Sequence, residues 1–228
     1  MQLIPIRKKY VYAPLERIDT PNGRLYSDGA SKVPSVTTIL DGTKDKTFLK
    51  EWEERVGKEE AERIRNDAAT VGTHMHNVME RLLLNRPLNP PRSWLAVKGY
   101  RMGYALIEHF FPDVQEVWGA EVPVHYPGRY AGTTDCVAVY KGTPSIVDFK
   151  QANKMKKREW IEDYFVQLAA YATAHNKVHG TEINQGVIMM VAQNGEVQEF
   201  ITCGREFEGY QDKWMARVAQ FEKAAIVE

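Results

Sequence analysis

The sequence predicts a mixed α/β protein, with a central mixed sheet flanked by helices and a helical N-terminal region. Three observations predict this class. Stretches of helical periodicity dominate the first half, three β-prone runs follow from residue 114, and a helix then alternates with further strands. We expect one domain over residues 1–228, in which residues 1–111 are mainly helical and residues 112–228 carry the sheet.

The N-terminal part is expected to contain a hairpin followed by helices. Residues 10–27 supply YVYAPLERI and RLY around the turn PNG, and VPSVTTILDG predicts a short helical turn that ends at Gly42. Residues 48–84 predict a helix divided near Gly57, and residues 92–111 predict another that FPD ends. The apolar candidates of that last helix are Trp94, Val97, Tyr104, Leu106 and Phe110.

The second half predicts the sheet. Strand-like runs VQEVWGAEVPVHY, RYAGTTDCVAVY and PSIVDFK are separated by the turn signals PG and KGTP. A helix is expected over residues 157–179, then a hairpin of GVIMMVAQ and VQEFITC around NGE, and finally an amphipathic helix over residues 205–224.

Composition excludes several classes of protein. Lys and Arg number 30 and so do Asp and Glu, so net charge does not indicate a partner and any basic surface must be local. The two cysteines lie far apart in sequence, which argues against an iron–sulfur cluster or a structural zinc. The chain has no apolar run long enough for a membrane helix and no signal or transit peptide pattern, so we expect a cytoplasmic protein without a membrane partner.

Two acids interrupt apolar strand-like runs. Asp135 lies near the start of one expected strand and Asp148 near the end of the next, so an antiparallel hairpin brings their carboxylates together at one edge of the sheet. Lys150 follows two residues later and points to the same face as Asp148. Such oxygen ligands suit Mg²⁺ or Mn²⁺, and an ammonium beside the ion can orient an attacking water. Strand-end acids and a surface lysine are the alternative interpretation.

The helix around VGTHMHNVMERLLLN carries polar residues beside its apolar stripe. His76 and Glu80 share a face, whereas His74 points outward. His76 is therefore the better candidate for a metal ligand, and a half-buried histidine paired with Glu80 is the alternative. The spacing lacks the second histidine of a zinc-protease motif.

The helix of WIEDYFVQLAAYATAH places polar Gln167 among core residues of one face, which are Trp160, Tyr164, Leu168, Tyr171 and His175. A buried glutamine needs partners, and a lysine or a metal-bound water would serve. The dense basic run before this helix consists of Lys154, Lys156, Lys157 and Arg158. Beside a phosphate-cleaving site it would hold a nucleic-acid backbone, and alone it would be a solvated helix start.

Together these motifs resemble the PD-(D/E)XK nuclease superfamily in its RecB-like exonuclease branch. That branch carries GxxxH with a following glutamate, GxxD, (D/E)xK and QxxxY in this order. The corresponding segments here are residues 72–76 with Glu80, residues 132–135, residues 148–150 and residues 167–171. Within the branch, PSVTTIL, GTTDCVAVYKG, VDFK and QLAAYA are most similar to the mitochondrial genome maintenance exonuclease family and its phage relatives.

The resemblance implies a restriction-endonuclease-like core and metal-dependent hydrolysis of DNA phosphodiesters, usually from the ends of single strands. It implies that His76, Asp135, Asp148 and the Phe149 carbonyl hold one or two Mg²⁺ or Mn²⁺ ions, and that Lys150 assists the attacking water. Supporting or DNA-binding roles fall to Glu80, Glu121, Gln167 and Tyr171. Gln151 departs from the threonine that many relatives carry, and the compact chain fits a bacterium or a phage-infected host cell.

Two other functions are compatible with these residues. A structure-specific DNA endonuclease would use the same chemistry, and a circular single-stranded substrate would separate it from an exonuclease. A non-catalytic DNA-binding module on the same fold would lack a metal-binding acid or the lysine, whereas Asp135, Asp148 and Lys150 are all present.

Overall fold

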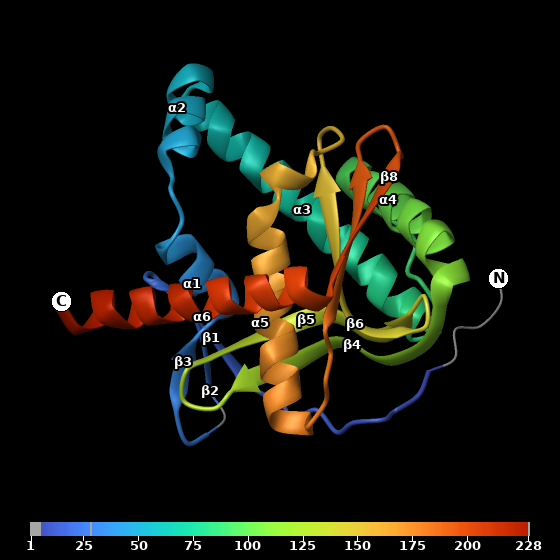
Figure 1. The fold of residues 1–228 in the computed structure, drawn as a ribbon. Helices are drawn as coiled ribbons and strands as arrows, with labels where there is room; N and C mark the ends of the chain where they lie inside the picture. The colour runs from blue at the N-terminus through green and yellow to red at the C-terminus, as the bar shows by residue number, and fades with distance from the viewer. Residues whose placement is uncertain (1–5, 28, 228) are drawn as a thin grey trace.

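The computed structural model describes residues 6–27 and 29–227, with side chains up to residue 224. It confirms a mixed α/β fold in which helices flank a five-stranded mixed sheet (Figure 1). The elements, in chain order, are β1 (Glu16–Thr20), β2 (Gly23–Ser27), β3 (Lys32–Pro34), α1 (Val36–Gly42), α2 (Thr47–Val56), α3 (Lys58–Leu83), α4 (Trp94–Phe110), η1 (Phe111–Asp113), β4 (Val114–Tyr126), β5 (Tyr130–Tyr140), β6 (Thr143–Ala152), η2 (Arg158–Trp160), α5 (Glu162–His179), β7 (Gln185–Ala192), β8 (Val197–Cys203) and α6 (Gly204–Val227).

The central sheet has the order β4-β5-β6-β7-β8, so its strands are neighbours in sequence order. Pairing is antiparallel throughout except between β6 and β7, which are parallel. Parallel neighbours need a crossover connection, and α5 supplies it, as the helical pattern between these two strands predicts. β7 is buried along its whole length, which fits its apolar sequence after Gln185.

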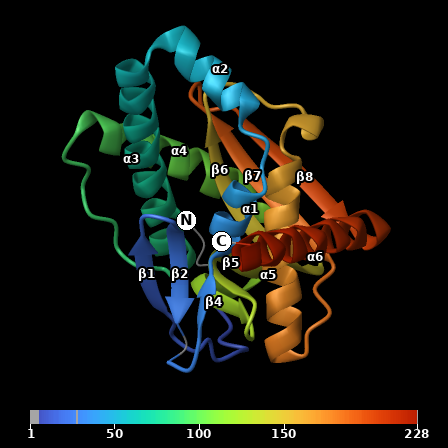
Figure 2. The ribbon, with the colours of Figure 1, turned by 90° about the vertical axis from the view of Figure 1, so that its left-hand side faces the viewer.

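Each face of the sheet packs against its own layer of helices (Figures 1 and 2). One core joins α1, α5 and α6 to side chains such as Val137 and Ile146. The other joins α3 and α4 to Val147 and Phe149, which alternate with the first set along the strands. The acids of β5 and β6 therefore have to be accommodated between two apolar layers.

The helix boundaries follow from local chemistry. Ser35 accepts a hydrogen bond from the backbone N–H of Thr38 at the start of α1, and Ser93 does the same for Ala96 at the start of α4. Gly57 separates α2 from α3 with a φ of 89°, as the sequence predicts for a break near this residue. Gly180 ends α5 in the left-handed conformation.

Some expected core residues are exposed. Trp94 and Tyr104 of α4 are 72% and 43% exposed, because the buried face of this helix is formed by Met102, Leu106, Ile107, Phe110 and three small residues. Trp160 is 63% exposed because it lies in the short η2 helix, before the regular face of α5 begins. The prediction of a core role for these three aromatics was wrong.

The N-terminal hairpin is a small sheet of its own. β1 and β2 pair around the expected PNG turn, and a third strand, β3, which the sequence did not predict, pairs with β2. Tyr26 of β2 shares a hydrogen bond with Thr133 of β5, 3.2 Å apart. The hairpin is thereby fixed beside the central sheet, close to the strand that carries Asp135.

Candidate active site

Asp135 and Asp148 lie in the middle of β5 and β6, where the pairing of these strands stops. The last paired residues are Cys136 and Val147, so the two aspartates occupy the next position on each strand. Beyond it, β5 stays paired with β4 and β6 with β7. The expectation that the acids meet is confirmed. Their expected place near strand ends at a sheet edge was wrong, because both strands continue past the point where they separate.

The carboxylate of Asp135 takes over a backbone interaction at this separation. Its Oδ2 accepts a hydrogen bond of 2.8 Å from the backbone N–H of Phe149. A buried backbone donor needs a partner, and the side chain replaces the carbonyl that a continued ladder would have supplied. This contact fixes the Asp135 side chain beside Asp148, whose residue is only 2% exposed.

Lys150 connects the acids to α5. Its Nζ lies 2.5 Å from Asp148 Oδ2 and 3.3 Å from Gln167 Oε1, and the Gln167 amide donates to the Tyr171 hydroxyl over 3.0 Å. Lys150 therefore shares a face with Asp148, as their spacing predicts. The buried glutamine also has the partners that it requires.

His76 and Glu121 both lie close to Asp135. The Nδ1 of His76, on α3, lies 3.4 Å from Asp135 Oδ2 and 3.9 Å from Glu121 Oε1. These three residues offer ligand atoms that all lie within 4.8 Å of one another. Imidazole and carboxylate donors at such separations can hold a divalent metal ion.

Glu121 reaches this cluster through an irregularity in β4. Its φ is 50°, a left-handed conformation that is rare for a residue with a side chain. Ala120 and Val122, on either side of it, belong to opposite cores. Backbone strain of this kind concentrates at functional sites, which supports a role for Glu121.

The gathered acids alter the proton affinities of the site. Burial, then the charges of Asp135, Glu80 and Asp148, raise the pKa of Glu121 to about 8. Burial and Asp148 raise the pKa of Asp135 to about 6 against the opposing effects of His76 and Lys150. Burial disfavours the charged form of Lys150, but Asp148 and Asp135 outweigh it and hold the pKa above its usual value. A cation bound here would relieve this repulsion.

Gly132, of the GxxD motif, makes room for Tyr171. A Cβ at Gly132 would lie 2.7 Å from Cε1 of the Tyr171 ring, far inside normal contact. The GxxD and QxxxY motifs therefore fit together: the glycine of one motif allows the tyrosine of the other to lie against β5. The Tyr171 hydroxyl then reaches Gln167 and, through it, Lys150.

These side chains line one cavity of about 830 Å³. It brings together His76, Glu80, Glu121, Asp135, Asp148, Lys150, Gln167 and Tyr171. Phe149 is buried in the core that joins the sheet to α3 and α4, and a ligand role for its carbonyl stays a prediction. His74 lies on the α4 side of α3, half-buried against Gly99 and outside the cavity lining, so the expectation that it points outward was wrong.

The basic run lies elsewhere. Among the described residues, neither Arg158 nor its three lysine neighbours in the run belong to the cavity lining. The Arg158 guanidinium pairs with Glu206 of α6 over 2.8 Å and lies over the Phe165 ring, so it joins η2 to the helices. A DNA-binding role for Lys154, Lys156, Lys157 and Arg158 stays a prediction.

Sequence reasoning missed a second wall of the cavity. The hairpin contributes Arg17, Arg24 and Tyr26, and Thr37 of α1 lies beside them. Gln151, also in the lining, donates a short hydrogen bond to the Ala68 carbonyl and so links β6 to α3. The PSVTTIL similarity was the available signal for this wall, because it marks a segment that lies beside the site.

No family model matches this chain. Curated proteins with similar sequences are mitochondrial genome maintenance exonuclease 1 of Xenopus tropicalis, 27% identical over 96% of this chain and 65% of that protein, and that of Homo sapiens, 27% identical over 83% and 58%. The chain thus spans about three fifths of the length of these relatives. A solved structure from Eubacterium rectale aligns over 70% of this chain and 66% of its own, at 12% identity and a TM-score of 0.49, too low for a conclusion.

The similarity covers nearly the whole chain and includes the segments that meet in the cavity. The four motifs, which are dispersed in sequence, form one contiguous set of side chains around Asp135 and Asp148. The sequence similarity supports the assignment of this chain to a PD-(D/E)XK-like exonuclease family.

Proposed function

We propose that this protein is a metal-dependent nuclease that hydrolyses DNA phosphodiester bonds, acting as an exonuclease on single strands. The observation that carries the proposal is the convergence of buried Asp148, half-buried Asp135, Lys150 and His76 in one open cavity. Buried acids in the middle of strands are unfavourable for folding, so their presence requires a functional explanation. The similarity to proteins named as exonucleases supports the same chemistry.

The residues around the cavity suit the binding of a hard divalent cation such as Mg²⁺ or Mn²⁺. His76, Glu121 and Asp135 would hold it. Asp148 adds a buried oxygen, Oδ2, which lies close to Lys150 but has no well-aligned hydrogen-bond donor. A bound cation would polarise the phosphoryl oxygens and lower the pKa of a bound water. Oxygen-rich ligands with one imidazole match this class of ion better than zinc or copper.

The protein's own residues have separable roles in this reaction. A water oxygen attacks phosphorus, one bond from phosphorus to a sugar oxygen breaks, and that oxygen leaves with a proton. Lys150 orients the water and stabilises the negative charge that develops on the phosphoryl group. Gln167 and Tyr171 hold the lysine in place through the contacts described above.

Cleavage of end-labelled DNA tests the proposal. Wild-type protein with Mg²⁺ or Mn²⁺ should degrade linear single-stranded DNA, and EDTA should stop it. Asp148→Ala and Lys150→Ala should abolish cleavage while keeping a cooperative thermal transition. Exposed Lys8 lies outside the cavity lining, and Lys8→Ala serves as the matched control. Full activity of both site variants would refute the assignment, and DNA binding without cleavage in Mn²⁺ would favour a non-catalytic module.

Circular single-stranded DNA separates the two modes of cleavage. An exonuclease cannot start on a circle, so linear DNA should disappear while circular DNA stays intact. Comparable loss of both substrates would show endonuclease activity at the same site. Duplex DNA in the same time course tests the preference for single strands.

A further inference from the structure

The cavity is poor in positive charge for a site that would accept a polyanion. Among the described residues that line it, Arg17, Arg24 and Lys150 carry the positive side chains. Lys150 contacts Asp148 directly. The two arginines of the β1–β2 hairpin therefore provide the positive charge that remains available for substrate phosphates.

Both arginines contact one carboxylate. Arg17 donates to both oxygens of Asp19 from Nε, at 3.2 and 3.0 Å, and from Nη2 to Oδ1 at 3.1 Å. The Nε of Arg24 donates to Oδ1 of the same Asp19 over 3.1 Å. Two positive charges thus share one negative charge, and these contacts use neither Nη1 of Arg17 nor the two terminal nitrogens of Arg24. Planar guanidinium groups fixed in this way match the geometry of a phosphate.

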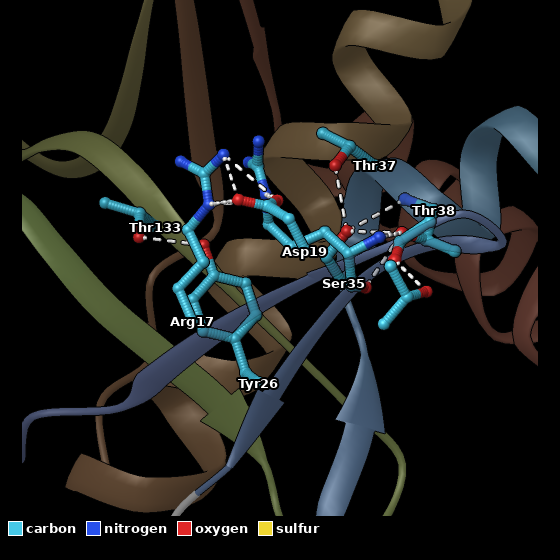
Figure 3. A network of polar contacts seen from close by, with 10 residues as sticks. Arg17, Asp19, Tyr26, Ser35, Thr37, Thr38 and Thr133 are labelled. Carbon is cyan, nitrogen blue, oxygen red and sulfur yellow. Dashed lines mark hydrogen bonds and ion pairs between the residues drawn. The ribbon is translucent and has the colours of Figure 1, made fainter.

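The PSVTT segment, whose Ser35, Thr37 and Thr38 are drawn in Figure 3, fixes the backbone of Arg24. Thr38 Oγ1 accepts from the Arg24 N–H and donates to the Arg24 carbonyl, at 2.9 Å each, and the Ser35 N–H donates to the same carbonyl at 2.8 Å. Gly23, with a φ of 117°, lies so close that a Cβ would be 2.6 Å from Thr38 Cγ2. The hydrogen bonds of Thr38 and Ser35 in the PSVTT segment therefore position Arg24, not the acids Asp135 and Asp148.

The arginines and His76 line the same cavity. The hairpin and α3 thus both contribute to its lining, together with the acids of β5 and β6. A DNA strand with its scissile phosphate at the acids would pass beside the hairpin. The exposed fractions of the Arg17 and Arg24 side chains, 51% and 34%, leave both accessible to such a strand.

We propose that Arg17 and Arg24 bind a phosphate group of the DNA strand next to the scissile phosphate, with Asp19 orienting both guanidinium groups. Thr38 and Ser35 are positioning residues that act through Arg24. The inference rests on the proposed nuclease function and adds a substrate-binding element to it. The phosphate is either an internal phosphodiester or a terminal monoester, and the experiment distinguishes these.

The test measures binding of single-stranded oligonucleotides in EDTA, where cleavage does not occur. Wild type is compared with Arg17→Gln and Arg24→Gln, and Arg7→Gln is the control, because Arg7 is more exposed than either and pairs with Glu116 outside the cavity. Each site variant should bind roughly tenfold more weakly. The slope of log affinity against log salt should fall by about 0.7 per arginine. Arg7→Gln should change neither quantity.

Oligonucleotides with one neutral methylphosphonate at successive positions locate the contact. At one position, replacing the charged phosphate by the methylphosphonate should weaken binding to wild type about tenfold. The same replacement should weaken binding to Arg24→Gln by less than about twofold, because this variant has already lost the interaction with that phosphate. Thr38→Val should reduce discrimination at that same position. Sensitivity to removal of a terminal phosphate, with no sensitive internal position, would identify the monoester.

The outcomes separate this inference from the proposed function. If wild type cleaves DNA while both arginine variants keep wild-type affinity and salt slope, the inference is wrong and the nuclease function stands. A methylphosphonate scan of wild type in which no position is sensitive, and no terminal phosphate matters, overturns it without any variant. Arg24→Lys covers a folding failure of Arg24→Gln: it should keep the salt slope but lose part of the affinity, because it lacks the planar fork.

Discussion

Replacing Gly132 with alanine should disturb catalysis through Tyr171. The new Cβ would lie 2.7 Å from Tyr171 Cε1, and ordinary contact begins at 3.4 Å, so the ring has to move by about 0.7 Å. Overpacking lowers the free energy of unfolding by about 1–3 kcal/mol. Alanine also reduces the conformational entropy of the unfolded chain, which raises the free energy of unfolding by about 0.4–1 kcal/mol. We expect a net loss of about 1–2 kcal/mol in the free energy of unfolding. The displaced hydroxyl would also release Gln167 and Lys150, and kcat should fall roughly ten- to hundredfold.

Urea unfolding and single-turnover cleavage measure the two effects separately. Gly209→Ala is the control, because no atom lies within 4 Å of a Cβ at that exposed helical position, and its stability should stay equal or rise by up to about 1 kcal/mol. In a Tyr171→Ala background the destabilisation by Gly132→Ala should largely vanish, since the colliding ring is gone. An undiminished cost in that background would show that Tyr171 is not the cause, and wild-type kcat in Gly132→Ala would refute the link to Lys150.

Three further predictions concern stability. Gly99→Ala should lower the free energy of unfolding by about 2–3 kcal/mol in urea, because its Cβ would lie 2.7 Å from the Val71 carbonyl oxygen, a backbone atom that cannot turn aside; a loss below about 0.5 kcal/mol would contradict this. Burial and then His179 lower the pKa of His175 to about 4. Between this pH and about 6.5, the unfolded chain therefore binds a proton at this residue that the folded chain does not. The free energy of unfolding should fall by about 2 kcal/mol as the pH drops through that window. His175→Gln should flatten this pH dependence, and an unchanged curve would assign it to other groups. At a pH above about 8, where Glu121 is charged, Glu121→Gln should raise the free energy of unfolding in EDTA by about 1 kcal/mol, because it removes one negative charge from a crowded cluster. Mn²⁺ should abolish this gain, and a less stable variant in EDTA would show that the carboxylate is not repelled.

The sequence predicted the elements because their signals are local. Strand alternation, the PNG and KGTP turns and the break at Gly57 each depend on a few neighbouring residues, and the structure contains all of them. The meeting of Asp135, Asp148 and Lys150 followed from the same local rules, since an antiparallel connection and a two-residue spacing determine it. His76 could be selected over His74 because helical geometry places them on different faces.

The remaining features depend on long-range packing. Glu121 enters the cluster through a left-handed backbone conformation that no residue pattern announces. The pairing of Arg158 with Glu206 could not be predicted from local sequence, because these two residues lie 48 positions apart in the chain. The wall formed by Arg17 and Arg24 needs the hairpin to pack beside β5, and nothing in the hairpin's own sequence specifies that neighbour.

The aspartates interrupt β-prone runs because the sheet itself opens at their positions. Where β5 and β6 separate, the N–H of Phe149 loses its strand partner and Asp135 accepts it instead, so a carboxylate satisfies the backbone there as an apolar side chain could not. The same opening lets His76 reach Asp135 from α3, although α3 packs on the opposite face of the sheet from α5. One interruption in strand pairing thus allows residues from both helical layers to meet at a single point. If β5 and β6 stayed paired, Asp135 and Asp148 would be buried where neither a cation nor a phosphate could reach them. The separation of the two strands therefore gives these carboxylates the access to ligands that the proposed function needs.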